Sequence, residues 1–328
     1  MSGGQFVRKA ELFVVRDGDA YNLSQLHFRF KVKQFEDLTP SACDVRVYNP
    51  AHSTINDILG SSGRAEFASV VLKAGYEGSS QYGTIFIGSL IRVGRGRERN
   101  TDTYLDLLAA DNDTGYNFGV ANKSFGATAT VQDQIQYLAD QMKVKVDPAV
   151  FQTTGLRQNQ RPRGSVLWGL ARAHLAAIAN DAGGRFFVEQ GVLKFVPLTG
   201  YLPSQQRVRI NSQSGMVGQP ETTDNGINVT CLLNPSIHVG QAVELNNAEI
   251  NQQVVTAGGD APLSPNLLAY PALTRQDGLY RVIVHNIEGD TRGTTWYSRL
   301  ICLGIDPSLA DSNPGLSVKS FNQPNQPP

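Results

Sequence analysis

The stretch Leu26-His-Phe-Arg-Phe-Lys-Val32 decides the class of fold, because its apolar and polar residues alternate over a full strand. A period of two is typical of a β-strand with one buried face. Similar short runs recur at a spacing of roughly ten residues, with Gly, Asn and Asp turns between them. These further predicted strands are Glu11–Val15, Asp44–Tyr48, Ala68–Ala74, Gly83–Gly88 and Thr103–Ala109. Residues 1–115 are therefore predicted to form an antiparallel barrel or sandwich.

The hydrophobic period changes to that of a helix in residues 116–199. Residues 131–142 carry an amphipathic pattern with Thr130 as a plausible N-cap. A stronger helix is predicted to begin after Ser165, and Trp168 is one of its residues. A hairpin follows at residues 185–196, around the turn pair Gln190-Gly191. We expect a small α/β unit inserted between two β regions.

Strand patterns return in residues 200–308. The predicted strands there are Arg207–Ile210, Ile227–Leu233, Ala242–Leu245, Gly278–His285 and Trp296–Leu303. Residues 255–273 are rich in Gly, Pro, Ser and Asn and are interpreted as a long loop. Residues 309–328 are expected to form a flexible C-terminal tail. The fold class is thus mostly β with a small α/β insert, and two antiparallel β-barrel-like domains split by that insert would fit this order.

The charge of the chain is balanced, with 29 Lys and Arg against 29 Asp and Glu among 328 residues. A protein that binds nucleic acid through its phosphates would show a net excess of basic residues. Charged residues make up only 18% of the chain, below the roughly 25% of an ordinary soluble domain. A weakly charged polar surface suits broad protein contacts, because burying charges is costly. A merely neutral globular protein would fit this composition as well.

Targeting segments and cysteine chemistry give little signal. The chain has no run of about 18 apolar residues that would span a membrane, and its start carries no secretory signal pattern. The cysteines, Cys43, Cys231 and Cys302, are odd in number and far apart, so a disulfide framework or a zinc site is not expected. A reducing, cytoplasmic site of synthesis fits that usage.

Catalytic and cofactor motifs are not found in the sequence. No GxSxG, GxGxxG or P-loop pattern is present, and the five histidines lie on separate predicted elements. His285 is followed by Glu288, Asp290 and Arg292, which would allow a metal or acid–base site, although a polar turn between two strands explains the cluster better. His174 is interpreted as a surface or packed side chain of the predicted helix. No catalytic residue, metal ligand or cofactor is therefore assigned.

Four arginines, Arg92, Arg95, Arg97 and Arg99, cluster on one glycine-rich segment that is interpreted as a hairpin tip. Guanidinium groups in such a cluster could bind phosphate or an acidic patch on a partner protein. A solvated loop would explain the same pattern. The four arginines are the candidate residues for an interface between subunits or for the wall of a channel.

Three separated motifs carry a resemblance to a known family. They are Gly75-Tyr-Glu-Gly78, then Cys231-Leu-Leu-Asn-Pro235 within residues 214–240, and Gly289-Asp-Thr-Arg-Gly293 with Trp296-Tyr297 behind it. In this order they resemble the baseplate hub proteins of contractile-tailed bacteriophages, which are similar to the hub part of type VI secretion spike proteins. The resemblance covers roughly residues 5–305.

The resemblance implies a homotrimer whose paired β-barrel domains build a pseudo-sixfold ring in the virion, in the baseplate of the phage tail. Such a ring joins the tail tube and its initiator proteins to the central spike. It encloses a channel for the tape-measure protein, and the DNA crosses this channel during genome ejection without being bound specifically. Three copies of two similar domains would provide six equivalent positions. A protein of this kind is made in the cytoplasm of the host bacterium.

Residue roles follow only in outline. Cys231, Leu232, Leu233 and Pro235 are expected to pack the second barrel, and Gly289, Asp290 and Gly293 are expected to form the turn between two strands. Some hub relatives are fused to lytic domains, whereas this chain ends soon after its second β region, which argues against cell-wall cleavage.

Two other functions were weighed. A carbohydrate- or receptor-binding β module would need an exposed aromatic groove, yet Trp168 and Trp296 fall on predicted elements where core packing is the commoner role. A glycan hydrolase would need two carboxylates that converge in a cleft, and the sequence does not single out such a pair.

Overall fold

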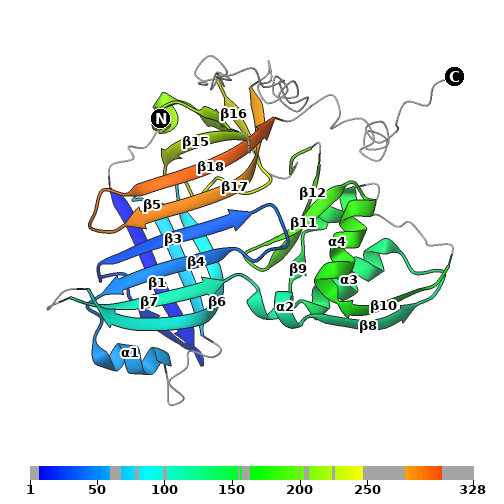
Figure 1. Cartoon of the computed structure of the whole chain (residues 1–328), viewed down its shortest axis with the longest axis horizontal. Coiled ribbons are helices and arrows are strands. Elements are labelled where there is room, and N and C mark those ends of the chain that lie inside the picture. Colours follow the sequence, from blue (N-terminus) through cyan, green and yellow to red (C-terminus); the bar gives the residue numbers. More distant parts are fainter. Residues whose placement is uncertain are drawn as a thin grey trace, which may run out of the picture.

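Figure 1 shows the computed structural model, which describes residues 7–59, 68–77, 81–98, 102–153, 156, 163–198, 200–202, 207–223, 226–246 and 278–304. The predicted long loop at 255–273, the predicted tail at 309–328 and Arg99 lie outside these residues. None of the helices in the described ranges is long and apolar enough to span a membrane.

One large, mainly antiparallel sheet of 13 strands holds both β regions. The first region supplies β1 (Arg8–Arg16), β2 (Asp19–Asn22), β3 (Phe28–Phe35), β4 (Ala42–Tyr48), β5 (Ser69–Tyr76), β6 (Tyr82–Arg97) and β7 (Thr103–Ala110). The second supplies β13 (Val208–Ile210), β14 (Glu221–Thr223), β15 (Gly226–Leu232), β16 (Ala242–Leu245), β17 (Leu279–Asp290) and β18 (Trp296–Gly304). The main hydrogen-bonded order is β14-β15-β18-β17-β3-β4-β7-β6-β5-β1-β2, and β16 joins at β17 with β13 beside it.

Strand β3 shows why the alternating sequence forms a half-buried sheet. Phe28, Phe30 and Val32 are buried, while the residues between them are exposed. Each apolar residue lies opposite an apolar partner on β4, such as Val45 opposite Phe30. Directly opposed residues share one face of a sheet, so these pairs build a common core, as the period of two predicts.

The two β regions meet where β3 pairs with β17, from Val284 opposite Phe35 to Asp290 opposite Arg29. Two clusters of buried side chains lie along the shared sheet, one dominated by the first region and one by the second. Strand β17 contributes Val282 to the second cluster and Ile287 to the first, and its register shifts between Val282 and Val284. Such an irregularity lets one strand direct side chains into two cores.

Two separate barrels are not confirmed. The described strands of both regions belong to one sheet whose main hydrogen-bonded order has two ends, so they form no closed barrel. The helix α1 (His52–Leu59) adds Ile55 and Ile58 to the first core at one end of the sheet (Figure 1).

The insert forms a lobe to the right of the large sheet in Figure 1, around a core of its own. Its elements are α2 (Asp113–Phe118), β8 (Val120–Phe125), α3 (Val131–Gln141), β9 (Lys145–Val146), η1 (Pro148–Gln152), β10 (Ser165–Leu170), α4 (Ala171–Asp181), β11 (Gly184–Glu189) and β12 (Val192–Pro197). The Thr130 hydroxyl accepts from the N–H of Asp133, and the Asp133 carboxylate accepts from the N–H of Thr130. This capping box confirms Thr130 as the N-cap of α3.

The helix predicted to begin after Ser165 begins only at Ala171. Residues Ser165–Leu170 form strand β10, which pairs antiparallel with β8. Gly169 has a φ of 116°, a conformation that cannot continue into a helix. Burial alternates along Val166-Leu-Trp168, but all three residues are apolar, so the sequence carries no period-two signal there. The end of α4 follows the sequence better, because Gly183 after the C-cap has a φ of 68°.

Candidate assembly surface

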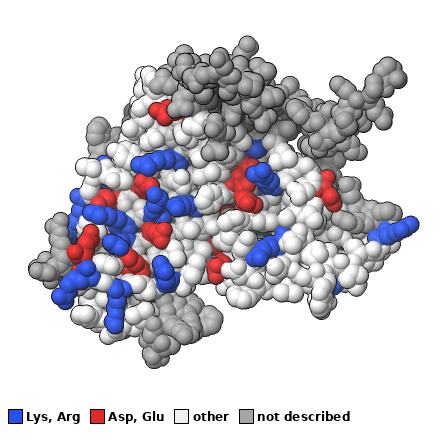
Figure 2. Space-filling model, viewed as in Figure 1, with Lys and Arg blue, Asp and Glu red and all other residues white. Residues whose placement is uncertain are grey.

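The solvent-facing side of the large sheet carries charged residues that pair across neighbouring strands. Arg29 lies opposite Asp290, Lys31 opposite Glu288, and Arg46 opposite Asp106. Figure 2 shows basic and acidic residues mixed over this half of the molecule. The corresponding ion pairs are Arg29 Nε–Asp290 Oδ2 at 2.8 Å, Lys31 Nζ–Glu288 Oε1 at 2.7 Å and Arg46 Nε–Asp106 Oδ1 at 2.7 Å.

The Arg46–Asp106 pair is the most constrained of these. Nε and Nη2 of Arg46 donate to the two carboxylate oxygens of Asp106 at 2.7 and 3.0 Å. The guanidinium also lies 4.1 Å from the centre of the Tyr104 ring. The hydrogen bonds that Arg46 donates to Asp106 raise the pKa of Arg46. Both side chains remain partly exposed, so such a pair contributes at most about 1 kcal/mol to stability.

A groove of about 900 Å³ runs over this charged face. Arg46, Arg92 and Asp106 line it on the side of β4, β6 and β7, while Arg29 and Asp290 line it on the side of β3 and β17. Because the lining charges of both signs are interleaved, the groove offers a partner a broad polar surface without a strong excess of either sign. This is the candidate assembly surface.

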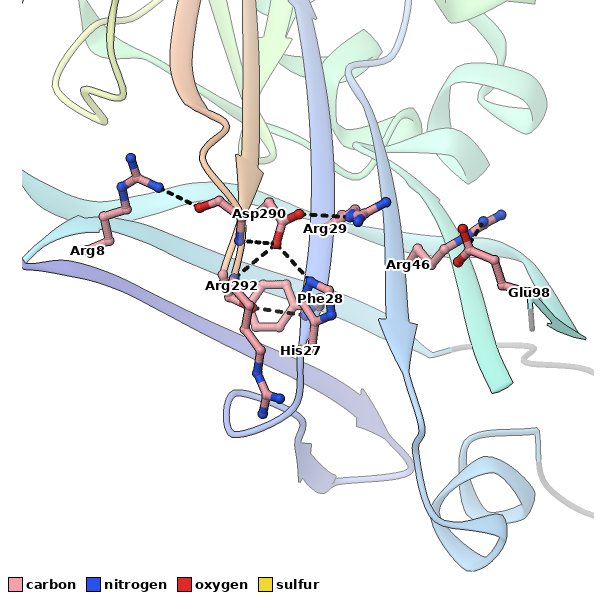
Figure 3. A network of polar contacts seen from close by, with 10 residues as sticks. Arg8, His27, Phe28, Arg29, Arg46, Glu98, Asp290 and Arg292 are labelled. Carbon is pink, nitrogen blue, oxygen red and sulfur yellow. Dashed lines mark hydrogen bonds and ion pairs between the residues drawn. The ribbon is translucent and has the colours of Figure 1, made fainter. Parts of the chain in front are cut away.

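At one end of the assembly surface, Asp290 fixes the loop between β17 and β18 (Figure 3). Its Oδ1 accepts from His27 Nε2 at 2.8 Å and from the backbone N–H groups of Arg292 and Gly293 at 3.0 and 2.8 Å. Its Oδ2 accepts from Arg29 Nε. Partial burial raises the pKa of Asp290, but these donors outweigh burial and hold the pKa below its usual value.

The glycines of this hairpin have different roles. Gly289 is a residue of β17, and a Cβ added there would lie 2.2 Å from the Phe30 ring. That ring in turn packs edge-on against Trp296 at 5.6 Å. Gly293 lies in the loop itself, and a Cβ there would lie 2.4 Å from the Asp290 carboxylate. Gly289 therefore makes room for an aromatic core, and Gly293 makes room for the carboxylate that holds the loop.

His285 does not belong to the Asp290 cluster. It is fully buried, and its Nε2 lies 3.0 Å from Ser298 Oγ. Burial lowers the pKa of His285 to about 3. Glu288 instead pairs with Lys31 and, at 3.4 Å, with Arg299. In the described part of the chain, no three His, Cys, Asp or Glu side chains come together as a metal site.

Arg92 does not share a side of β6 with Arg95 and Arg97. Arg92 lies opposite Leu108 and lines the groove, whereas Arg95 and Arg97 lie opposite Leu105 and Thr103. Since Leu105 is buried, the register places Arg95 and Arg97 on the other side of β6 from Arg92. Arg92, Arg95 and Arg97 lie on β6 itself, which ends at Arg97 opposite Thr103 of β7.

The motif at residues 231–235 joins the two cores. Cys231 is buried in the second core and Leu233 in the first, while Leu232 is partly buried against the first. Burial raises the pKa of the Cys231 thiol to about 12. The N–H of Leu233 donates to the carbonyl of Trp296 at 3.2 Å, and Pro235 lies beside Gly83 at the start of β6.

Sequence reasoning missed the polar junction between insert and sheet. Arg281 Nε lies 2.9 Å from Glu36 Oε2, and both side chains are buried. Nη1 of Arg281 also donates to the carbonyls of Pro197 and Gly200, each at 2.6 Å. Desolvation lowers the pKa of Arg281 and raises the pKa of Glu36. The positive charge of Arg281 opposes the rise at Glu36, and the negative charge of Glu36 opposes the fall at Arg281. No local pattern marks this pair, because Glu36, just after β3, and Arg281 on β17 are far apart in the sequence.

A family model described as Baseplate hub gp41 matches residues 47–256, which is more than half of the chain. The chain belongs to the baseplate hub gp41 family. Membership confirms the family resemblance and makes this chain a phage tail protein of the baseplate hub class.

Solved structures share the fold of this hub protein at low sequence identity. The prophage MuSo2 43 kDa tail protein from Shewanella oneidensis matches with a TM-score of 0.54 and 8% identity, over 90% of this chain and 97% of that one. A tail protein from Neisseria meningitidis MC58 matches with a TM-score of 0.51 and 11% identity, over 90% and 97%. No curated protein sequence matches the chain.

A secretion-system protein has the same fold. The E. coli c3393 protein, a component of the type VI secretion system with structural similarity to the T4 bacteriophage tail proteins gp27 and gp5, matches with a TM-score of 0.53. The identity is 9%, over 90% of this chain and 77% of that chain. Identities this low establish the shared fold alone.

Proposed function

We propose that this baseplate hub protein is a structural subunit of a contractile tail, in which three copies form a pseudo-sixfold ring between the tail tube and the central spike. The observation that carries the proposal is the tandem arrangement of two β cores along one sheet, joined through β3 and β17. Two related units per chain and three chains would supply six quasi-equivalent positions. Residues 1–115 and 200–308 would be the ring-forming domains, and residues 116–199 the insert.

The assembly surface suits a structural role. Its carboxylates, including Asp106, Glu288 and Asp290, are paired with basic side chains that come from neighbouring strands. A face on which positive and negative charges alternate fixes the orientation and register of a bound partner more than it increases the affinity. It would also let the tape-measure protein and DNA move along a channel without being held, because no excess positive charge attracts phosphates. We propose no enzymatic activity for the chain.

The partners we propose are two further copies of the chain, the tail tube with its initiator proteins, the spike and the tape-measure protein. Arg92, Arg95 and Arg97 come from two sides of β6 and could therefore meet different neighbours in the ring. Arg92 would contact a partner seated in the groove. Arg95 and Arg97 would contact a neighbour on the opposite side of the strand.

Substitution of the arginines tests the proposal. Changing Arg92, Arg95, Arg97 and Arg99 to Ser should leave the monomer folded but block ring formation or spike attachment, as measured by light scattering with purified spike protein. The double variant Lys143→Ser/Lys145→Ser, at exposed positions of the insert, is the matched control and should assemble normally. Normal assembly of the arginine variant would contradict the role assigned to the arginines.

A further inference from the structure

The β11–β12 hairpin lies where the insert meets the large sheet, and its tip contacts both β regions (Figure 1). Nε2 of Gln190, in the turn of the hairpin, donates to the carbonyl of Thr84 on β6 at 3.1 Å. Glu189 Oε1, one residue earlier, lies 2.8 Å from Nδ1 of His238, which belongs to the segment between β15 and β16. The tip therefore fixes the insert to the first and the second β region together.

Charged side chains are buried at this tip. Glu189 is 5% exposed, and its second oxygen, Oε2, accepts from Nζ of Lys194 on β12 at 2.5 Å. Asp111, just after β7, is also 5% exposed, and its Oδ1 accepts from the N–H of Gly191 at 3.2 Å. A buried charge is costly unless it is paired. The tip thus places two buried carboxylates against one ammonium group.

The charges of this cluster balance only when a proton is added. Ionised Asp111 and Glu189 carry two negative charges, Lys194 carries one positive charge, and neutral His238 carries none. Burial raises the pKa of Asp111 to about 6, and the charge of Glu189 adds to that rise. Burial also opposes the ionisation of Glu189, but His238 and Lys194 outweigh it and lower the pKa of Glu189. One further proton, on the Asp111 carboxyl or the His238 ring, makes the buried cluster neutral.

The groups that surround His238 do not replace this proton. A pocket of about 550 Å³ beside the ring is lined by Tyr82 of β6 and by Arg207. Burial raises the pKa of Tyr82, so its hydroxyl stays neutral. Arg207 is exposed and donates to the Tyr201 hydroxyl, so water and salt screen its charge. Burial lowers the pKa of His285 on β17 to about 3, so that ring stays neutral as well.

The base of the hairpin is held separately from the tip. Gly184 lies opposite Pro197 there. Arg281 of β17 pairs with Glu36 and donates to the Pro197 carbonyl. This pair has equal and opposite charges, so it needs no additional proton. Because the insert also has a core of its own, the tip can leave the sheet while the base stays tied and the insert stays folded.

We propose that Asp111, Glu189, Lys194 and His238 form a proton-controlled latch, in which uptake of one proton holds the tip of the β11–β12 hairpin against both β regions and loss of that proton releases it. Ionised Asp111 is better solvated in water than in the junction, which favours the released tip. A carboxyl whose pKa is raised in the closed state stabilises that state at low pH, and this contribution is lost as the pH rises through the raised pKa. The latch acts within one chain and does not depend on a ring.

Hydrogen exchange of the full-length chain over a pH series tests the latch. The N–H of Gly191 donates to Asp111, so its exchange reports release of the tip. After correction for the intrinsic exchange rate, the opening equilibrium should rise about tenfold between about pH 5 and 7. This is the change expected of a carboxyl whose pKa is about 6 in the closed state and 3.8 in the open state. Amides of β1 in the sheet and of α3 in the insert should show no such rise.

Two substitutions assign the effect to the cluster. Asp111→Asn makes the cluster neutral without a further proton, so the rise at Gly191 should shrink to less than about twofold. Asp147→Asn is the matched control, because Asp147 Oδ1 accepts from the N–H of Ala149 elsewhere in the insert, and this variant should keep the full rise.

The contact between Glu189 and His238 is tested at constant pH. His238→Ala should increase opening of the tip about tenfold at pH 5 and at pH 7, because it removes a donor to a buried carboxylate. His238→Gln can still donate and should restore part of the protection.

Wild type alone is enough to overturn the latch, since equal opening of the tip at pH 5 and 7 would contradict it whether or not the variants fold. A tenfold rise that persists in Asp111→Asn would also contradict it. An equal rise at β1, α3 and Gly191 would show that the proton acts on unfolding of the whole chain and not on the tip.

Discussion

The large sheet and the insert each contain one tryptophan, and the two residues have opposite environments. Trp296 is 1% exposed, with its ring against Phe30 and Arg8, whereas Trp168 is 71% exposed on the two-stranded β8–β10 ribbon. The two surfaces also differ in charge, because the sheet shows paired charges to solvent, while the face of the β8–β10 ribbon that carries Trp168 has no charged residue. The sheet therefore buries its apolar residues and presents a polar face, whereas the insert leaves apolar side chains exposed.

The largest expected effect separates the two tryptophans by stability. Trp296→Ala should lower the free energy of unfolding by about 3–5 kcal/mol, because it leaves a cavity beside Phe30 and Gly289. Urea unfolding followed by circular dichroism measures this. A loss below about 1 kcal/mol would contradict the difference between the two tryptophans, since it would mean that the core tolerates the cavity.

The next expected effect concerns the junction that joins the two regions. Arg281→Met should cost about 3–5 kcal/mol, because it leaves the Glu36 carboxylate buried without its partner. The double variant Glu36→Gln/Arg281→Met should recover part of that loss in urea unfolding. Arg29→Met, at the partly exposed pair with Asp290, is the matched control and should cost about 1 kcal/mol or less. Equal losses for both single variants would show that burial does not distinguish the two pairs.

The next expected effect is a pH dependence of stability that comes from Asp111, which contacts the insert at Gly191. Burial raises the pKa of Asp111 from 3.8 to about 6, against the N–H groups of Gln190 and Gly191 that donate to it. The folded state therefore binds more protons than the unfolded state between these values, and stability should fall as the pH rises from 4 to 6. The expected contribution is up to about 3 kcal/mol.

Urea unfolding at several pH values between 4 and 7 isolates this contribution. Asp111→Asn cannot titrate, so its unfolding free energy should lack this fall relative to wild type. If the unfolding free energies of wild type and Asp111→Asn change in parallel with pH over that range, Asp111 does not titrate as described.

A smaller effect is expected at the loop that Asp290 holds. Asp290→Asn should cost about 1–2 kcal/mol at neutral pH, because hydrogen bonds to a charged group are replaced by weaker ones. The lowered pKa of Asp290 means that its contribution is present above the unfolded pKa and is lost as the pH falls through the lower folded pKa. Unfolding at pH 7 and in acid, compared between variant and wild type, checks both the size and the sign.

The smallest expected effect completes the comparison of tryptophans. Trp168→Ser should change the unfolding free energy by no more than about 0.5 kcal/mol, since the side chain is exposed. Thermal unfolding of the isolated chain measures it. A loss near that of Trp296→Ala would show that Trp168 is part of the core.

The sequence could predict what depends on local pattern. The alternation at residues 26–32 marked a true strand, and Thr130 was correctly identified as a helix cap. Trp168 was placed on a helix because Val166, Leu170 and Ala173 fit the helical spacing of the apolar residues behind them. The pairing of β10 with β8 decides between the two structures, and β8 lies about forty residues earlier in the chain.

Long-range partners limited the prediction of the site. The position of Asp290 beside His27 and Arg29, and of Arg281 beside Glu36, depends on β17 pairing with β3. These residues are more than 240 positions apart, so no window of sequence contains both members of a pair. The arginine segment was visible as a cluster, but the register of β6 with β7 separates its members onto two sides.

The central claim, that the chain forms the hub ring, is tested most directly by the mass of the purified protein in solution. Light scattering would be recorded with and without the spike protein of the same virion. The account predicts three copies of the chain in one complex, either alone or once the spike is added. A mass of one chain that the spike leaves unchanged would contradict it.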